Sequence, residues 1–233
     1  MSDPLAGLPR NHYGVIYADP PWPFATWSPK GQGRSGEAHY VTMSHSEMAA
    51  FPVGELAGPD CVLFIWIVQT QVPQALDLVE AWGFELKSIA FYWGKGNSLP
   101  LFPEDVVTQM GMGKWTRAEF EQCWLATRGH PKRLHADVRQ GIIEPRREHS
   151  RKPDCVYSRI ERLVAGPYLE LFARTRRPGW DAWGNETDKF AAPYDPDSDA
   201  IGSYYDAIEA IGEDVKAGKR PVPTDGYFGS AKR

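Results

Sequence analysis

The sequence predicts an α/β protein built on a Rossmann-like sheet, parallel or mixed, with helices on both faces. Three observations support this. Short apolar runs typical of buried strands occur at 13–18, 61–68 and 168–173. Segments with helical periodicity separate several of these runs. The lengths of both kinds of segment fit strands that alternate with covering helices.

The first strand is expected at 13–18 and ends at Asp19. Its β-branched and aromatic residues favour a buried strand, and the two prolines after Asp19 cannot continue a hydrogen-bonded ladder. Residues 23–42 are rich in Gly, Ser and Pro without a clear period, which predicts a long loop. The sequence Ser-His-Ser-Glu at 44–47 resembles a capping box and predicts a short helix that ends near Phe51.

The unbroken apolar run at 61–68 predicts a strand covered on both faces. The expected elements then follow in order: a helix from Pro73 to Gly83, a strand at 84–93, a loop-rich segment at 94–119, a short strand at 122–127, a helix from Pro153 stopped by Gly166, and a strand at 168–173.

The pattern of the chain predicts where the folded domain ends. Residues 1–190 are expected to form one domain, because the strand and helix pattern breaks after Asn185. Residues 191–233 are expected to hold a linker, a helix at roughly 201–217 and a disordered tail. No internal repeat is present.

Composition excludes several classes of protein. Of the 233 residues, 42% are hydrophobic and 24% charged, which is ordinary for a globular chain. No apolar run is long enough to span a membrane, and the first residues do not resemble a signal peptide. Three dispersed cysteines fit neither a disulfide framework nor a paired metal site, so we expect a cytoplasmic protein without a metal.

The charge distribution is uneven. The formal net charge is -4, which does not by itself indicate nucleic-acid binding. Residues 128–152, however, contain eight Lys or Arg and three His against three acids. Such a stretch is either a local phosphate-binding surface or a solvated loop with scattered charges.

The segment Asp19-Pro20-Pro21-Trp22 carries the strongest chemical signal. It follows a strand, where open α/β sheets bind their ligands. The prolines fix the backbone and remove N–H donors, which we expect to leave the local carbonyls free, and Trp22 is expected to supply a flat face. A carboxylate and a carbonyl can each accept one hydrogen of an exocyclic amino group while its ring stacks on the indole. Both acceptors stabilise the charge that develops when that nitrogen attacks a methyl donor.

This segment resembles the catalytic motif of the MT-A70-like family of N6-adenine methyltransferases. Further segments resemble the family in the same order, so that the likeness covers about residues 13–190: HYVTMSHSEM at 39–48, CVLFIWIV at 61–68, YWGKGN at 92–97, GKWTRAEFEQCWLATRGHP at 113–131, HSRKPD at 149–154 and LELFARTRRPGWDAWGNE at 169–186. The resemblance implies an S-adenosylmethionine-dependent methyltransferase fold, with S-adenosylmethionine as cofactor and no metal.

The resemblance also implies roles for particular residues. Asp19, Pro20, Pro21 and Trp22 are expected to hold the target adenine, and Asp19 to lie at the methyl donor as well. The expected donor-site residues are Lys152 at the carboxylate end, Arg174 near the ribose, and Asn185 with Glu186 at the ribose and adenine. Tyr40 and Glu121 lie in matching segments and are expected to line the substrate side.

The chain also departs from the family. Larger members have a strand upstream of the motif that contacts the donor, whereas only 18 residues precede Asp19 here. No glycine-rich donor loop of the FxGxG kind follows a strand. The larger eukaryotic enzymes need a partner subunit, and the sequence leaves open whether this chain forms a homo- or hetero-oligomer.

The function predicted from these features is methylation of adenine N6 in DNA, as in bacterial or phage relatives. The alternatives are the same reaction on RNA, cytosine-N4 methylation, and a non-catalytic nucleic-acid-binding subunit of a methyltransferase complex. A fourth alternative, NAD binding, depends on the GxGxxG at 31–36, which lies inside a predicted loop rather than between a strand and a helix.

Overall fold

The computed structural model describes residues 3–23, 42–96, 115–145, 147–148 and 151–190, together with Glu213 and Ala217. Both helices and strands form along this part of the chain, as the sequence predicts. In chain order they are β1 (Tyr13–Ala18), α1 (His45–Ala49), α2 (Val53–Leu56), β2 (Ala57–Ile67), the 3-10 turn η3 (Gln69–Gln71), α3 (Val72–Ala81), β3 (Glu85–Gly96), β4 (Phe120–Arg128), β5 (Gly141–Pro145), α4 (Cys155–Leu163), β6 (Tyr168–Leu171) and β7 (Trp180–Trp183).

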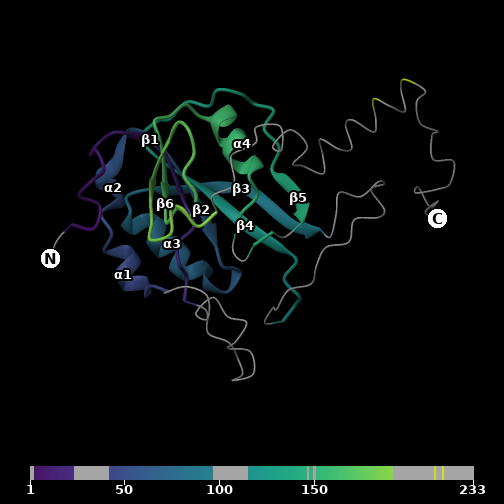
Figure 1. The fold of residues 1–233 in the computed structure, drawn as a ribbon, viewed down its shortest axis with the longest axis horizontal. Coiled ribbons are helices and arrows are strands. Elements are labelled where there is room, and N and C mark those ends of the chain that lie inside the picture. The colour runs from purple at the N-terminus through teal and green to yellow at the C-terminus, as the bar shows by residue number, and fades with distance from the viewer. Residues whose placement is uncertain are drawn as a thin grey trace.

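The described strands form one mixed sheet of seven, in the order β5-β3-β4-β2-β1-β6-β7 (Figure 1). Strand β1 lies between β2 and β6 and runs parallel to both. Strand β4 is antiparallel to β2 and to β3, whereas β5 and β7 are parallel to their neighbours β3 and β6. The prediction of a parallel or mixed sheet is therefore confirmed.

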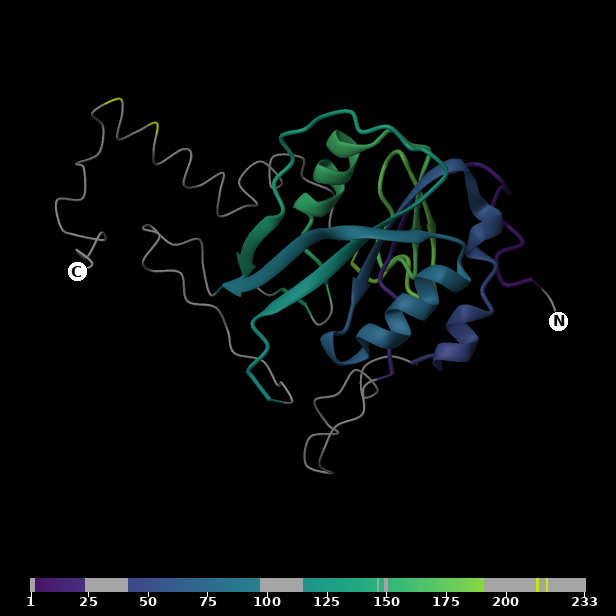
Figure 2. The ribbon, with the colours of Figure 1, turned by 180° about the vertical axis from the view of Figure 1, so that it is seen from behind.

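Helices cover both faces of this sheet, as predicted. Helix α4 lies on one side, and α1 and α3 lie on the other (Figure 2). Two separate clusters of buried residues correspond to these layers. One contains Met48 of α1 and Leu78 of α3, and the other contains Val156 and Ile160 of α4.

Strand β1 explains why the first apolar run has no polar positions. Ile16 and Ala18 belong to the cluster under α1 and α3, whereas Val15 and Tyr17 belong to the cluster under α4. Alternate residues of a strand face opposite sides of the sheet, so a strand covered on both sides must be apolar throughout. The same rule accounts for the unbroken run in β2, whose last seven residues are all buried.

Local signals placed several elements correctly. The predicted capping box is present: Ser44 accepts a hydrogen bond from the backbone N–H of Glu47, and the Glu47 carboxylate accepts one from the backbone N–H of Ser44 at 2.7 Å. Helix α3 has a proline in its first turn and is followed by Gly83 at a φ of 80°. Only glycine adopts that conformation readily, which is why the helix ends there.

Other elements were not predicted. Strand β3 continues to Gly96 through residues that the sequence assigned to a loop, because β5 pairs with its last five residues. Strands β5 and β7 are short edge strands without an apolar alternation, so their pairing depends on neighbours that are distant in sequence. Helix α2 has only four residues, too few to show a helical period.

Some expectations lie outside the described residues. These are most of the expected loop at 23–42 with the GxGxxG sequence at 31–36, and the residues from 191 onward other than Glu213 and Ala217. The domain boundary at 190 therefore remains a prediction.

A glycine substitution directly after β4 tests how closely the chain packs there against β2. Gly129 has a φ of 65°, and a Cβ there would overlap the carbonyl oxygen of Pro59. Gly179 has a φ of 79° with open space around it. In urea denaturation we expect Gly179→Ala to lower the free energy of unfolding by about 1 kcal/mol and Gly129→Ala by about 3 kcal/mol, because backbone must also move. Equal losses would contradict the packing described.

Candidate active site

The predicted site residues gather at one edge of the sheet. The carboxyl ends of β1, β6 and β7 lie at this edge because these strands are parallel. Asp19 follows β1, Arg174 follows β6 within three residues, and Asn185 follows β7 within two. Strand β4 runs the opposite way, so its first residues, including Glu121, reach the same edge. Ligands of open α/β sheets bind at this position.

Lys152 connects two of these carboxylates. Its Nζ lies 2.9 Å from Oδ2 of Asp19 and 3.4 Å from Oε2 of Glu121. The Lys152 side chain is only 13% exposed. Asp19, which lies more than 100 positions before Glu121 and Lys152, therefore forms one ionic cluster with them. Partly buried charges need such partners, because an unpaired charge is costly to bury.

Lys95 extends the cluster along β3. Its ammonium pairs with Glu121 and lies 5.2 Å from the centre of the Trp93 ring. Burial acts to raise the pKa of Glu121, but attraction by Lys152 and Lys95 outweighs it and holds that pKa at about 2. Glu121 is therefore anionic at neutral pH, and the cluster contains two carboxylates and two ammonium groups.

The segment Asp19-Pro20-Pro21-Trp22 differs from expectation at Trp22. We predicted an open indole face, but Trp22 is only 4% exposed and packs in the cluster under α1 and α3. Its ring N–H donates a 2.9 Å hydrogen bond to the carbonyl of Trp66 in β2. Trp22 therefore fixes the loop after β1 to the neighbouring strand and presents no stacking surface in this structure. The ring is apolar enough to be drawn into the core once its N–H is satisfied.

The proline carbonyls also differ from expectation. The Pro20 oxygen accepts a 2.8 Å hydrogen bond from the Trp22 backbone N–H, and the Pro21 oxygen accepts one of 3.0 Å from Met43. The prediction that no N–H competes for these carbonyls is wrong. Each carbonyl oxygen keeps a second lone pair, and these contacts hold both carbonyls in place.

The other predicted residues form a second polar group beyond β6 and β7. The Arg174 Nε lies 3.9 Å from Oε2 of Glu186, and Lys189 donates to both oxygens of Glu186 at 2.7 and 2.8 Å. Asn185 is exposed beside them. Gly184 lets the segment after β7 lie close to the segment after β6, because a Cβ at Gly184 would overlap the backbone of Ala173. Tyr40 lies outside the described residues.

A buried carboxyl group that the sequence analysis overlooked lies behind Asp19. Glu170 in β6 is 9% exposed and accepts a 2.9 Å hydrogen bond from the Tyr157 hydroxyl of α4. The Arg177 guanidinium lies 3.9 Å from the centre of the Tyr157 ring. Burial, assisted by the charge of Asp19, raises the pKa of Glu170 to about 8. The sequence feature that could have indicated this buried carboxyl group is the single glutamate between two leucines at 169–171.

This buried group is connected to the segment that carries Lys152. Arg177 pairs with Asp154 at 3.9 Å, and Asp154 immediately precedes α4. Asp154 also binds Arg151 at 3.2 Å and Arg147. Only Pro153 separates Lys152 from Asp154, so these pairs fix the backbone from which Lys152 reaches Asp19.

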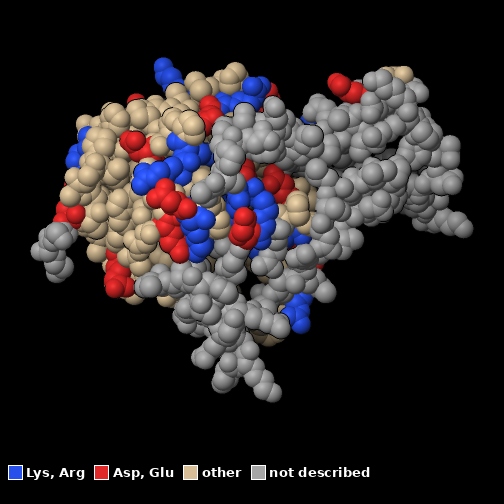
Figure 3. Space-filling view, viewed as in Figure 1, with Lys and Arg blue, Asp and Glu red and all other residues tan. Residues whose placement is uncertain are grey.

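The same contacts resolve the expectation for the basic stretch at 128–152. Arg147, Arg151 and Lys152 are paired with acids, and Arg128 donates to the carbonyl of Gly54. Figure 3 shows blue and red side chains side by side on this face rather than a patch of one sign. Much of the basic charge is therefore used within the fold.

Other kinds of site find less support. Burial raises the pKa of the Cys61 thiol to about 12 and, with the charge of Asp19, raises that of Cys123 well above its usual value. Neither is an activated nucleophile. Within the described ranges, no three His, Cys, Asp or Glu side chains are grouped to hold a metal ion. No helix there has the length and apolar character needed to cross a membrane.

The doubly covered sheet, with a DPPW segment at the carboxyl end of β1 and a lysine paired to its aspartate, defines an α/β methyltransferase. The chain belongs to the MT-A70 family: the family model, described as MT-A70, matches residues 13–186.

Similar proteins come from bacteria and eukaryotes. The "Type II methyltransferase M.MunI" of a Mycoplasma species is 32% identical over 77% of this chain and 79% of its own length. The "N(6)-adenosine-methyltransferase MT-A70-like protein" of Drosophila melanogaster is 31% identical over 76% of this chain. The human "N(6)-adenosine-methyltransferase catalytic subunit METTL3" is 29% identical over 76% of it. This chain spans only 27% and 28% of the length of these two eukaryotic proteins.

The raised pKa of Glu170 predicts a pH dependence of stability. In the unfolded chain this carboxyl titrates near 4.5, and in the folded protein near 8. Between these values the folded state binds more protons, so the free energy of unfolding falls as pH rises, by up to about 1.4 kcal/mol per pH unit, and levels off above 8. Glu170→Gln keeps an acceptor for Tyr157 and removes this slope.

The measurement is urea denaturation of both proteins between pH 5 and 8.5. Subtracting one curve from the other removes the titration of His and other groups that the proteins share. The groups facing Glu170 are Tyr157, Arg177, Asp154 and Asp19. Parallel curves would show that Glu170 is ionised throughout, and would contradict the assignment.

Proposed function

We propose that this protein transfers a methyl group from S-adenosylmethionine to the N6 amino group of adenine in DNA. The observation that supports this most directly is the contact of Lys152 with Asp19 at 2.9 Å, at the carboxyl end of β1 and next to two fixed proline carbonyls. Asp19, Pro20 and Pro21 are consecutive, so this segment offers a charged acceptor and neutral acceptors at the edge where open α/β sheets bind their ligands.

These acceptors suit an aromatic amino group. Asp19 accepts one amino hydrogen at a carboxylate oxygen, and the free lone pair of the Pro20 carbonyl accepts the other. With both hydrogens bound, the nitrogen lone pair is withdrawn from the ring and directed away from the acceptors. The positive charge that develops on nitrogen is then stabilised by Asp19. Because Trp22 is buried, the faces that sandwich the base belong to other residues.

The residues present fit S-adenosylmethionine. Lys152 is a partly buried cation at the right edge for a carboxylate, and Arg174, Asn185 and Glu186 offer polar groups for ribose hydroxyls and a base. When bound, S-adenosylmethionine supplies an electrophilic methyl carbon, whose bond to sulfur breaks as the amino nitrogen attacks. Holding the nitrogen in line is the contribution of this chain. Lys152, which pairs with Asp19, would hold the donor carboxylate.

DNA is the proposed substrate because the relative that this chain matches over most of both lengths is named a type II methyltransferase. RNA is the alternative, since the eukaryotic relatives are named N6-adenosine methyltransferases. A base within a duplex must leave its stack to reach this edge. We infer a preference for single strands, and place the reaction in the cytoplasm of a bacterial or phage-infected cell.

An aspartate substitution tests the reaction. Asp19→Asn keeps the shape of the side chain but removes the charge that stabilises the developing cation, so we expect kcat to fall at least about 100-fold. Asp77→Asn, on α3 away from the edge, is the matched control. Labelled S-adenosylmethionine is incubated with single- and double-stranded DNA and RNA oligonucleotides, and the modified nucleoside is identified after digestion.

N6-methyladenine from the wild type and the control, with little from Asp19→Asn, supports the proposal, and the preferred oligonucleotide distinguishes DNA from RNA. N4-methylcytosine as product would replace adenine with cytosine as the target. Donor binding without product on any oligonucleotide would favour a non-catalytic subunit or a missing partner. NAD binding without donor binding would sink the methyltransferase proposal.

A lysine substitution tests the donor site. Lys152→Met removes the ammonium that we assign to the donor carboxylate, and loss of one charged hydrogen bond weakens binding about tenfold or more. Lys87→Met, in β3 and paired with Glu85, is the control. Isothermal titration with S-adenosylhomocysteine measures the Kd. An unchanged Kd in Lys152→Met would remove this residue from the donor site.

A further inference from the structure

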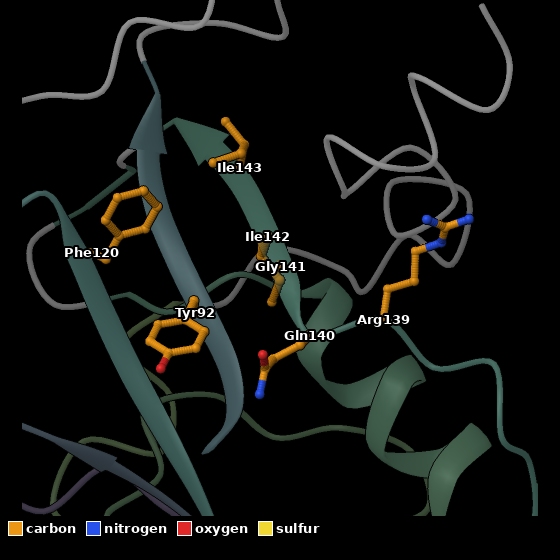
Figure 4. Close-up of a pocket in the computed structure, with 7 residues that line it drawn as sticks. All are labelled: Tyr92, Phe120, Arg139, Gln140, Gly141, Ile142 and Ile143. Carbon is orange, nitrogen blue, oxygen red and sulfur yellow. The ribbon is translucent and has the colours of Figure 1, made fainter. Parts of the chain in front are cut away.

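A hollow on the surface lies beside the candidate active site. It has a volume of about 600 Å³ and is lined by Tyr92, Phe120, Arg139, Gln140, Gly141, Ile142 and Ile143. Figure 4 shows the rings of Tyr92 and Phe120 on neighbouring strands, close together on one side of the sheet, with Ile143 across from them on β5. The size falls in the range of small-ligand sites.

The hollow exists because glycine occupies the strand between its walls. A Cβ at Gly94 would lie 2.6 Å from Cδ1 of Ile143 and 2.8 Å from Cε1 of Phe120. Without that atom, both side chains lie directly over the backbone of β3. Gly141, the first residue of β5, leaves room on the next strand. Phe120 nevertheless remains 40% exposed, which is unusual for a phenylalanine in a strand.

The hollow adjoins the edge where methyl transfer is proposed, on the face of β4 opposite to Glu121. Phe120 directly precedes Glu121, which binds Lys152, and its carbonyl accepts a 2.8 Å hydrogen bond from Gln69 after β2. Neighbouring strands lie about 4.8 Å apart, so β4 and β3 lie about 10 Å and 14 Å from β1 along the edge. A nucleic acid strand with its target base at Asp19 can therefore place a neighbouring nucleotide over Phe120 and Tyr92.

The chemistry of the lining suits a base. Exposed aromatic rings on a sheet stack on nucleobases, whatever their sequence. The Gln140 amide lines the hollow and donates to the carbonyl of Ile89, and Arg139 extends away from the rings (Figure 4). A flat protein partner would need a much larger surface than this.

We propose that Phe120 and Tyr92 form a subsite on which a base flanking the target adenine stacks. This inference rests on the proposed function and deepens it, since contacts to flanking nucleotides set sequence context in enzymes that act on single bases. Specificity then arises within the sheet itself, beside the catalytic cluster.

The test is a thermodynamic cycle between protein and substrate. The probes are a fluorescent single-stranded DNA with one adenine, its RNA counterpart, and versions with an abasic nucleotide at each of three positions on either side. Fluorescence anisotropy gives the Kd for the wild type, Phe120→Ala and Phe120→Trp. Leu76→Ala, which removes a 43% exposed leucine of α3, is the control.

We expect one flanking abasic position to weaken binding to the wild type about tenfold, and Phe120→Ala to weaken binding of the intact strand to a similar extent. Because both changes remove the same contact, together they should cost no more than either alone. Phe120→Trp should restore the affinity, and Leu76→Ala should leave every Kd unchanged.

Additive effects at all positions would overturn the subsite while leaving the proposed function intact. A fall in molecular mass of Phe120→Ala by light scattering, with oligonucleotide binding unchanged, would also overturn it and assign the hollow to a protein contact. A wild type that binds neither DNA nor RNA would overturn both proposals together.

Discussion

The ion pairs of Lys152 organise the functional edge of this protein. Asp19 ends a central strand, Glu121 begins an antiparallel one, and Lys152 lies in the segment before α4. The partly buried ammonium of Lys152 therefore connects three segments of the chain. Without this ammonium, the two nearby carboxylates would repel each other and would be costly to bury. Lys95 supplies the second positive charge. The cluster thus fixes the position of the Asp19 carboxylate at the end of β1.

The buried network behind the edge maintains this arrangement. Tyr157 and Arg177 connect Glu170 of β6 to Asp154, which adjoins the start of α4. A polar network of this kind is costly unless all its members are satisfied, so it favours one relative position of helix and strand. Its position close to Asp19 means that helix α4 cannot shift on the sheet without disturbing Lys152. The stability of the fold and the geometry of the site therefore depend on the same contacts.

The antiparallel strand β4 brings residues of two different kinds to this edge of the sheet. A purely parallel sheet would bring only strand ends of one kind to the edge. Here β4 delivers the start of a strand, so Glu121 faces the ionic cluster while Phe120, one residue earlier, faces the opposite side of the sheet. One strand thereby serves the charged cluster on one face and the aromatic hollow on the other.

The sequence alone determined most of the framework. Strands β1 and β2 were predicted because two-sided burial leaves a purely apolar run, and α1 because its capping box is a local hydrogen-bond pattern. Asp19 could be singled out from the sequence as a candidate site residue, because the four residues of the DPPW motif are consecutive. Tertiary structure alone decided the rest. Trp22 was drawn into the core because Trp66 offered its N–H a partner, and β5 and β7 became strands only by pairing with β3 and β6. Contacts of Lys152 and Glu170 link distant segments, and no local pattern records which partners the folded chain brings to them.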